Sequence, residues 1–307
     1  MSLRIAAKYV SRITHEEYVL LSLTEKYSRK YRKVPVEELK KRLPFSDEYI
    51  SLLIRRLVDS GLIQHFKEPY ESAVLLSRGL DVLALKRLTD KGIVAGVGRC
   101  IGVGKEADIY EVVDGHGNRL SVKVYRLGRV SFKKIMKHRS YAFVTASSKW
   151  IARNYIAAKR EYMYLTKLYN CGVSVPKPLC RVMHMIAMEI IDGWPLVNII
   201  DIDNPYEIFH EIIDEIIKAW NCGVVNGDLN EYNIFLTKDE YKPVLIDWPQ
   251  ATSRDDRSAV DHLIGDMYSV GSYFIKRYEC ESNKIMSFIK DVLIKNEIPP
   301  EKVEELI

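Results

Sequence analysis

Residues 226–236 read Asn-Gly-Asp-Leu-Asn-Glu-Tyr-Asn-Ile-Phe-Leu, and residues 244–249 read Val-Leu-Ile-Asp-Trp-Pro. In these stretches Asp228, Asn233 and Asp247 stand beside short apolar runs that predict strands. One carboxylate at this spacing can accept a proton from an attacking hydroxyl, while the amide and the second carboxylate can hold a divalent metal against the phosphates of ATP. The pattern predicts a phosphotransfer site on two strand-flanked loops.

A glycine turn further upstream predicts the part of the site that binds phosphate. Residues 101–113 read as a strand, a tight turn and a second strand. Glycines let backbone N–H groups approach phosphate oxygens because no side chain intervenes. Lys123 lies between two valines on the next predicted strand, the position of the phosphate-pairing lysine of protein kinases. The candidate nucleotide contacts in the turn are Gly102, Gly104, Lys105 and Glu106.

Two more segments complete the expected nucleotide site. Glu161 is the first acidic residue after a long basic window and lies on a predicted helix, so it is the candidate partner of Lys123 in an ion pair. Residues 186–193 read as a strand that runs into a loop, in the position of the hinge that pairs with adenine. A plain core strand is the alternative interpretation of this segment. The candidate adenine contacts are Met188, Glu189 and Ile191.

The N-terminal region predicts three helices followed by a hairpin. Residues 14–17 form a capping box, and Ser46 caps a later helix whose apolar residues recur at helical spacing over residues 50–58. Short strands are predicted at residues 62–66 and 72–76. This order is typical of a winged helix-turn-helix.

In winged helix-turn-helix modules the third helix enters a groove of a nucleic acid. Arg55 and Arg56 lie off the apolar stripe of that helix and are the candidate nucleic-acid contacts. Residues 1–42 carry eleven basic and five acidic residues, which favours a polyanionic partner. Winged helices also serve as protein-interaction or dimerisation modules, and that alternative stays open.

The charge distribution points to a polyanion a second time. The net charge is only +5, yet residues 119–160 hold twelve Lys or Arg and no Asp or Glu. Aromatic residues are interleaved with these charges, which suits stacking on bases as well as contacts to phosphate. In the alternative interpretation the aromatic side chains belong to the core and the charges are simply solvated.

The composition is that of an ordinary globular chain of 307 residues, 47% hydrophobic and 28% charged. No apolar run reaches the roughly 18 residues that span a bilayer, and no signal peptide opens the chain, so no membrane partner is expected. The five cysteines are scattered and include no Cys-x-x-Cys pair, so neither a zinc site nor a disulfide framework is expected. A reducing, cytoplasmic setting fits this pattern.

Together these residues resemble the RIO family of atypical kinases, and its type-two branch closely. A winged helix in front of the kinase-like region marks that branch. The long C-terminal extension of eukaryotic members is missing, so the sequence looks archaeal. The resemblance rests on Gly-Val-Gly-Lys-Glu-Ala-Asp at 102–108, Arg-Leu-Gly-Arg-Val-Ser-Phe at 126–132, Val-Pro-Lys-Pro at 175–178, Gly-Asp-Leu-Asn-Glu-Tyr-Asn at 227–233 and Ile-Asp-Trp-Pro-Gln at 246–250.

The resemblance implies an α+β protein in which a winged helix-turn-helix precedes a bilobal protein-kinase-like domain with a truncated C-terminal lobe. The expected limits are a winged-helix domain at 1–84, a linker at 85–98 and a RIO kinase domain at 99–307, with its N-lobe at 99–187, hinge at 188–193 and C-lobe at 194–307.

The resemblance also implies an ATP-dependent serine/threonine kinase with ATPase activity that acts in maturation of the small ribosomal subunit. Asp228 is the expected catalytic base, Asn233 and Asp247 the expected ligands of Mg²⁺ or Mn²⁺, and Lys123 the contact to the α- and β-phosphates. In this family the metal-loop aspartate can itself accept the phosphoryl group, which makes Asp247 a candidate acceptor. Ser131 is a candidate autophosphorylation site. The expected partners are the pre-ribosomal small subunit and its rRNA, with ribosomal proteins as candidate substrates.

Three positions depart from the family pattern. Ala107 stands where Ser is usual, Asn226 where His is usual and Trp248 where Phe is usual. None of these changes removes a proton acceptor or a metal ligand, so an active enzyme is expected.

Two alternatives to the kinase interpretation were weighed. A small-molecule phosphotransferase of the aminoglycoside-kinase type also uses a Gly-Asp-Leu loop, but it predicts a larger C-terminal lobe with an acidic pocket and no winged helix, which the sequence does not favour. The other alternative is a non-catalytic RNA-binding scaffold that retains ATP. The physiological substrate, the RNA site, the oligomeric state and the relative weight of kinase and ATPase activity stay open.

Overall fold

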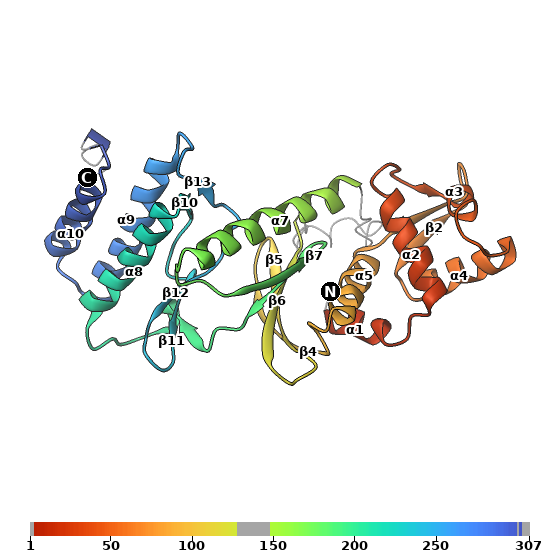
Figure 1. Cartoon of the computed structure of the whole chain (residues 1–307), viewed down its shortest axis with the longest axis horizontal. Helices are drawn as coiled ribbons and strands as arrows, with labels where there is room; N and C mark the ends of the chain where they lie inside the picture. The colour runs from red at the N-terminus through yellow and green to blue at the C-terminus, as the bar shows by residue number, and fades with distance from the viewer. Residues whose placement is uncertain (1–2, 128–147, 300, 303–307) are drawn as a thin grey trace, which may run out of the picture. The chain divides into compact units, whose positions relative to one another are not determined.

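The structure is a computed structural model that describes residues 3–127, 148–299 and 301–302. The chain divides into two compact units. The first consists of Met1–Lys159 with Leu179–Met188, and the second of Arg160–Pro178 with Glu189–Ile307. Figure 1 labels most of the helices and strands. The first unit contains the N-terminal domain and a five-stranded sheet, and the second is mainly helical.

The helices of the N-terminal domain begin where the sequence predicts. Thr14 caps α2 (His15–Tyr27): its hydroxyl accepts from the Glu17 N–H, while the Glu17 carboxylate accepts from the Thr14 N–H. Ser46 caps α4 (Asp47–Asp59) through a main-chain N–H of the first turn. The other elements of this domain are α1 (Leu3–Val10), β1 (Val34–Pro35), α3 (Val36–Lys40), β2 (Ile63–Phe66), β3 (Ser72–Leu75) and α5 (Ser77–Asp90).

The predicted winged helix-turn-helix is confirmed. The apolar stripe of α4 is buried, and Gly61 follows that helix with the left-handed φ of +63° that glycine tolerates. β2 and β3 pair antiparallel as predicted, and β1 adds a third strand in the order β1-β3-β2. Neither β1 nor α1 was predicted. α1 packs against α5 and β4 (Gly96–Val103), so it joins the N-terminal domain to the neighbouring sheet within the first unit.

That neighbouring sheet has five strands in the order β4-β5-β6-β8-β7 and carries the glycine turn and Lys123. β5 pairs antiparallel with both β4 and β6, as the strand–turn–strand prediction requires, and these strands are yellow in Figure 1. Val122 and Val124 are fully buried on either side of Lys123. The strands besides β4 are β5 (Ala107–Val113), β6 (Arg119–Tyr125), β7 (Pro178–Val182) and β8 (Met185–Glu189).

The position of α5 does not match the domain limit that the sequence predicts at residue 84. It continues without a break across residue 84, and β4 begins at Gly96, so the expected linker at 85–98 contains the last turn and a half of a helix and the first residues of a strand. Leu85 and Leu88 are buried and extend the apolar face of α5. The helix therefore belongs to the packed interior of the first unit.

The described residues of the second unit form helices and two small sheets. Its helices include α8 (Pro205–Asn221), α9 (Ala259–Tyr278) and α10 (Ser282–Lys295). The sheets have the orders β12-β11-β9 and β10-β13. The remaining elements are α7 (Ser148–Asn170), in which the two units meet along the chain, β9 (Gly193–Pro195), η1 (Leu196–Asn198), β10 (Val224–Val225), β11 (Ile234–Thr237), β12 (Pro243–Leu245) and β13 (Thr252–Ser253).

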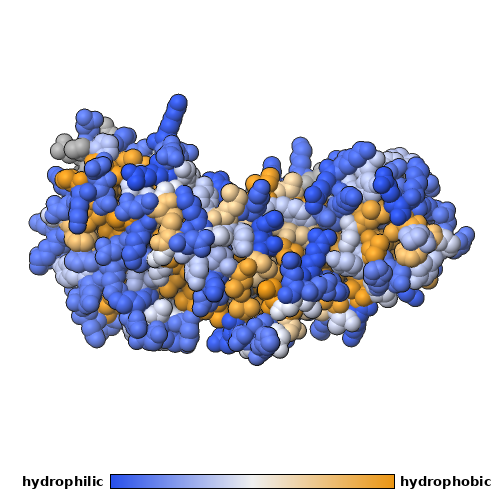
Figure 2. All heavy atoms as spheres, in the orientation of Figure 1, coloured by the Kyte–Doolittle hydropathy of each residue, from blue (hydrophilic) through white to orange (hydrophobic). Residues whose placement is uncertain are grey.

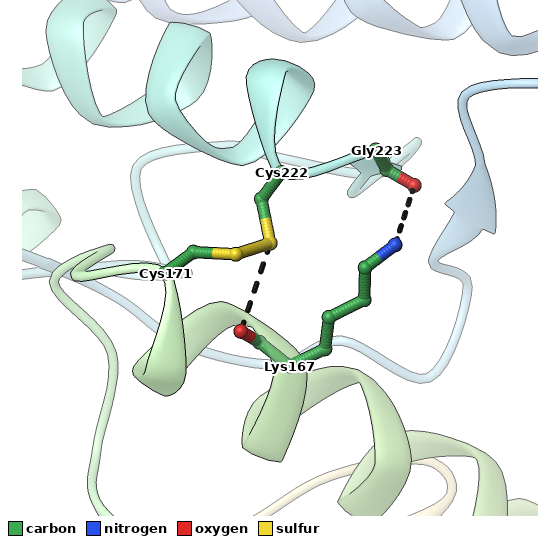
Figure 3. Close-up of a disulfide and its surroundings, with 4 residues drawn as sticks. All are labelled: Lys167, Cys171, Cys222 and Gly223. Carbon is green, nitrogen blue, oxygen red and sulfur yellow. Dashed lines mark hydrogen bonds between the residues drawn. A yellow bond between two sulfur atoms is a disulfide. The ribbon is translucent and has the colours of Figure 1, made fainter.

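A disulfide corrects the expectation drawn from the cysteines. Cys171 and Cys222 are bonded, with their Cα atoms 6.1 Å apart (Figure 3). Cys171 follows the end of α7 and Cys222 the end of α8, so the bond joins two helix ends that are 51 residues apart in the chain. Spacing alone could not reveal this pair because the contact arises only when α7 and α8 pack. The other three cysteines, Cys100, Cys180 and Cys280, are free.

Hydrophilic and apolar areas alternate over the face of the molecule shown in Figure 2. Within the part of the chain that the structure describes, every helix is too short or too polar to cross a membrane.

Candidate active site

The glycine turn between β4 and β5 is closed by a main-chain hydrogen bond. The Gly104 N–H donates to the Ala107 carbonyl at 2.8 Å. A Cβ atom at Gly104 would lie 3.1 Å from that same carbonyl oxygen, which is tighter than ordinary packing allows, so the close turn favours glycine here. Gly102 has room for a Cβ beside Ile109. Lys105 is exposed at the tip and Glu106 is partly buried. The turn has the compact form predicted for a phosphate loop, and phosphate contact itself stays a prediction.

Lys123 is buried on β6, with only 5% of its surface exposed. It lies opposite Ile109 of β5, and its Nζ is 5.6 Å from the centre of the Tyr125 ring. Lysine is almost never buried without a specific role for its ammonium group. The predicted ion pair with Glu161 joins residues of different units and stays a prediction.

Glu161 is bonded to the metal loop of the second unit. Its side chain lies on α7, is 1% exposed, and accepts a hydrogen bond from the Trp248 N–H through Oε1 at 3.0 Å. Trp248 is itself buried and donates its indole N–H to the Leu245 carbonyl at 3.3 Å. The tryptophan that stands where Phe is usual in the family is thus a buried apolar side chain. Glu161 therefore holds the main chain directly after Asp247.

Asn226 bridges the two loops that carry the predicted catalytic residues. Its Oδ1 accepts from the Asp228 N–H at 3.1 Å, and its Nδ2 donates to the Asp247 carbonyl at 3.1 Å. Only 4% of Asn226 is exposed. The sequence marked this residue as a departure from the family pattern but did not reveal its bridging contacts.

Asp266 binds the main chain of the loop that carries Asp228. This residue was not identified from the sequence. Its carboxylate accepts from the Gly227 N–H at 2.8 Å and from the Leu229 N–H at 2.9 Å, on either side of Asp228. Burial raises the pKa of Asp266 to about 6, against the two N–H bonds and the nearby His262, which lower it. The signal in the sequence is an aspartate inside the apolar stripe of α9, which Leu263, Met267 and Val270 form at helical spacing.

Asn233 and Asp247 lie at the same end of the β11–β12 hairpin. Ile234, next to Asn233, pairs with Leu245, and the Ile246 N–H donates to the Asn233 carbonyl at 2.9 Å. The Asn233 amide also donates to the Asp228 carbonyl at 3.1 Å. These bonds place the main chains of all three predicted polar residues in one hydrogen-bonded assembly.

This donor set fits magnesium. Asp247 has a left-handed φ of +63°, which is uncommon for a residue with a side chain and recurs at functional sites. Among the described residues no group of three or more His, Cys, Asp or Glu could hold a metal ion by itself. Magnesium commonly takes one or two protein oxygens and completes its shell with phosphates and water, so an amide and a carboxylate are enough.

Main-chain groups of the predicted hinge already form hydrogen bonds with other parts of the protein. Met188 lies in β8 with 7% exposed, and its carbonyl accepts from the Ser121 hydroxyl at 3.3 Å. The Glu189 N–H donates to the Lys177 carbonyl at 2.9 Å, so this N–H is already used. Ile191 follows β8 and is partly exposed. Adenine contacts by these residues stay predictions.

The remaining predicted residues are Arg55, Arg56 and Ser131. Arg55 and Arg56 are exposed on α4, as their position off the apolar stripe implies, and the Arg56 guanidinium lies 4.0 Å from the Glu17 carboxylate. Ser131 lies outside the described residues, as does the whole of 128–147 within the basic window at 119–160.

The second unit also contains an acidic cleft that the sequence did not suggest. Its volume is about 370 Å³, and Lys242 is its one basic lining residue. This finding corrects the expectation that no acidic pocket is present. The acidic lining residues are Asp201, Asp203, Glu207, Glu211 and Glu240.

Two family models match this chain, one in the N-terminal domain and one in the region that carries the candidate site. A family model described as "RIO domain" matches residues 108–286, and one described as "Rio2, N-terminal" matches residues 10–91. The chain belongs to the RIO family. The pair of matches, in this order, is that of its Rio2 branch, and the predicted family and fold class are confirmed.

Relatives in the Rio2 branch come from eukaryotes and archaea. The serine/threonine-protein kinase rio2 of Dictyostelium discoideum is 36% identical over 225 residues, which are 73% of this chain and 43% of that protein. The RIO-type serine/threonine-protein kinase Rio2 of Methanocaldococcus jannaschii is 30% identical over 258 residues, which are 82% of this chain and 93% of that protein. The chain thus spans less than half the length of the first relative and nearly all of the second.

A solved structure of the same branch superposes over nearly the whole chain. It is the Rio2 kinase–ADP/Mg²⁺–phosphoaspartate complex from Chaetomium thermophilum, with a TM-score of 0.80 and 26% sequence identity. The superposition covers 97% of this chain and 96% of that one. A second Rio2 kinase structure from the same organism has a TM-score of 0.77 at 29% identity.

Proposed function

We propose that this protein is an ATP-dependent serine/threonine kinase of the Rio2 type with ATPase activity. The observation that carries the proposal is the assembly of the second unit, in which Asn226 and Asp266 hold the loops of Asp228 and Asp247. The names of the Rio2 relatives and the ADP/Mg²⁺ complex of the Chaetomium thermophilum kinase support it.

Each polar residue has a role in this mechanism. Asp228 accepts the proton of the attacking hydroxyl or orients a water molecule, and its exposed position leaves it accessible to a substrate. Lys123 binds the α- and β-phosphates, with Glu161 as its partner. Asn233 and Asp247 would hold Mg²⁺ or Mn²⁺, which neutralises charge on the transferred phosphoryl group.

Asp247 is also our candidate phosphoryl acceptor. In that step the bond between the γ-phosphorus and its bridging oxygen breaks, ADP leaves, and an Asp247 carboxylate oxygen forms an acyl phosphate. Hydrolysis of the acyl phosphate by water then restores Asp247 and releases phosphate, which completes an ATPase cycle. The phosphoaspartate in the Chaetomium thermophilum complex supports this proposal.

We place this activity in the cytoplasm, on precursors of the small ribosomal subunit and their rRNA. The basic N-terminal domain and exposed Arg55 and Arg56 support a nucleic-acid partner, and ribosomal proteins or Ser131 are the candidate phosphorylation targets. Co-sedimentation with small ribosomal particles tests the partner. Release with ATP but not with a non-hydrolysable analogue supports a timed ATPase, whereas no binding under any nucleotide condition contradicts the proposal.

The test of catalysis is Asp228→Ala. We expect ATP hydrolysis and autophosphorylation to fall by about a hundredfold or more, while binding of ATP with Mg²⁺ is retained, because Asp228 acts on the nucleophile and not on the nucleotide. Asn221→Ala, at an exposed position at the end of α8, is the control.

Two results would contradict the kinase proposal. Equal hydrolysis by the wild type and Asp228→Ala favours a scaffold that only retains ATP. Faster phosphorylation of an aminoglycoside than of any protein would favour the small-molecule phosphotransferase. The acidic cleft of the second unit is the observation that keeps the latter alternative worth testing.

A further inference from the structure

A buried ionic cluster in the first unit joins the N-terminal domain to the five-stranded sheet. Asp81 lies on α5 and is 1% exposed. The Arg126 guanidinium donates to both of its carboxylate oxygens, at 2.6 and 2.7 Å, and His184 Nε2 lies 2.9 Å from Oδ1. A buried carboxylate is strongly destabilising unless it is matched in this way.

The charge states of the cluster follow from burial and pairing. Burial alone would raise the pKa of Asp81, but Arg126 and the bond from His184 hold it below its usual value. Burial lowers the pKa of His184. At neutral pH the cluster is therefore a carboxylate, a guanidinium and a neutral imidazole whose Nε2–H donates to Asp81. The opposite nitrogen, Nδ1 of His184, is buried and has no hydrogen-bond partner among the residues that the structure describes, so Asp81 is what orients this ring.

Arg126 is bonded to the glycine turn as well. The main-chain N–H of Arg126 donates to the Glu106 carbonyl at 2.6 Å, and the side-chain Nε lies 3.8 Å from the Asp108 carboxylate. Glu106 and Asp108 stand on either side of Ala107, where the turn enters β5. Lys123 stands three residues before Arg126, on β6, which ends at Tyr125. One arginine thus links a carboxylate of the N-terminal domain to the turn expected to hold phosphate.

The main chain around Arg126 is fixed on both sides. The Tyr125 N–H donates to the His184 carbonyl at 3.0 Å, and the Leu127 N–H donates to the side chain of Asn154 at 2.9 Å. Asn154 is fully buried on α7. A change at Asp81 would therefore release the guanidinium and not the backbone. The nearest carboxylate left to that cation is Asp108, and a full ion pair there would pull on the end of the turn.

We propose that Asp81 and Arg126 are positioning residues through which the N-terminal domain sets the conformation of the glycine turn and thereby the affinity for ATP. The inference rests on the proposed function, because it takes this turn to hold the phosphates. It assigns to the N-terminal domain a part in nucleotide binding that is independent of any nucleic acid.

The test compares two buried carboxylates of the N-terminal domain. Asp81→Asn removes the partner of Arg126, and we expect it to weaken binding of ATP with Mg²⁺ by about ten- to a hundredfold while kcat at saturating ATP changes less than about threefold. Glu25→Gln is the matched control, since Glu25 is also buried (3% exposed) but is bonded to Arg29 and Tyr155, away from the turn. We expect the control to bind ATP like the wild type.

Hydrogen exchange of the peptide covering residues 102–109 gives a readout that needs no nucleotide. Asp81→Asn should exchange this peptide about tenfold faster, and Glu25→Gln at the wild-type rate. Equal exchange and equal ATP affinity in Asp81→Asn and the wild type would overturn the inference while leaving the kinase proposal intact. A wild type that binds no ATP would instead overturn the kinase proposal, and with it the claim about ATP affinity.

A double variant separates positioning from mere loss of stability. Asp81→Leu with Arg126→Met removes both charges together, and replacing a buried ion pair by apolar residues is often neutral for stability. We expect thermal stability to recover in the double variant while ATP binding stays weak, because the guanidinium that lies beside Asp108 at the end of the turn is gone. Recovery of ATP affinity together with stability would show that the cluster only stabilises the fold.

Discussion

Asn226 shows how one side chain can set the geometry of two catalytic loops. We predict that Asn226→Ala lowers kcat by about ten- to a hundredfold, because the variant loses the bonds to the Asp228 N–H and the Asp247 carbonyl. Binding of ATP should change little, since Asn226 is expected to touch neither phosphate nor adenine. Single-turnover kinetics measure the effect. Asn226→His, which restores the usual family residue, should retain more activity than the alanine variant, and the reverse order would contradict the bridging role.

Asp266 predicts a pH dependence of stability. Its pKa is raised to about 6 in the folded protein, mainly by burial, so the folded state binds a proton that the unfolded chain has already released. The contribution of Asp266 to the free energy of unfolding is therefore greatest below its unfolded value of 3.8 and is lost as the pH rises through about 6. Urea unfolding between pH 4 and 8 should show a shallower dependence in Asp266→Asn. Equal slopes would mean that another group is responsible.

The same residue predicts a pH dependence of activity with the opposite sign. Only the ionised carboxylate accepts both N–H bonds fully, so kcat should rise as the pH rises through about 6. A pH–rate profile of Asp266→Asn, which cannot ionise, should be lower and should lack this rise. An unchanged acid limb would assign it to a different group.

The polar residues of the site could be predicted from sequence, but their supports could not. Asp228, Asn233 and Asp247 follow short apolar runs within 20 residues of each other, so their spacing is a local signal. The supports Asp266 and Asn226 act through bonds that form only after α9 and the β10–β13 region fold together. A single buried polar residue on an apolar helix face is the trace that such a support leaves in a sequence.

At the scale of the elements, the exposed arginines of α4 predict an effect on RNA binding. Arg55→Glu with Arg56→Glu should weaken RNA binding by about tenfold or more and lower its salt dependence, because two exposed cations that can contact phosphate become anions. Titrations at several salt concentrations measure both effects. Lys290→Glu with Lys295→Glu on exposed α10 gives the same change in net charge and should bind RNA as the wild type does. An equal loss in both variants would point to net charge alone.

The elements found from sequence are those with a local start or stop signal. The caps at Thr14 and Ser46 act within one turn of the chain, so α2 and α4 begin where the sequence predicts. β1 is two residues long and exists only because β3 pairs with it, and α1 exists by packing on α5 and β4. α8 has a capping Asn204 and a proline in its first turn, so the start of this helix is also marked by local residues in the sequence.

At the scale of the whole molecule, the Cys171–Cys222 disulfide predicts a dependence on reductant. In the chain-entropy account, a link across 51 residues raises the free energy of unfolding by about 4 kcal/mol. Adding dithiothreitol, or replacing both cysteines by serine, should lower the urea midpoint by the corresponding amount. Cys100→Ser is the control because Cys100 is exposed and free. A midpoint that ignores reductant would show that the two thiols are not bonded in solution.

The Asp81 contact has a consequence for dissecting the molecule into parts. A fragment that starts after α5, chosen so as to retain the RIO domain match at 108–286, would discard the carboxylate and keep the arginine. Its sheet would carry Arg126 without the carboxylate that its guanidinium contacts at both oxygens. Low activity in such a fragment would reflect that loss and not the intrinsic chemistry of the site. The smallest portion of this chain worth assaying as an enzyme therefore begins before Ser77, inside what sequence families count as a separate domain.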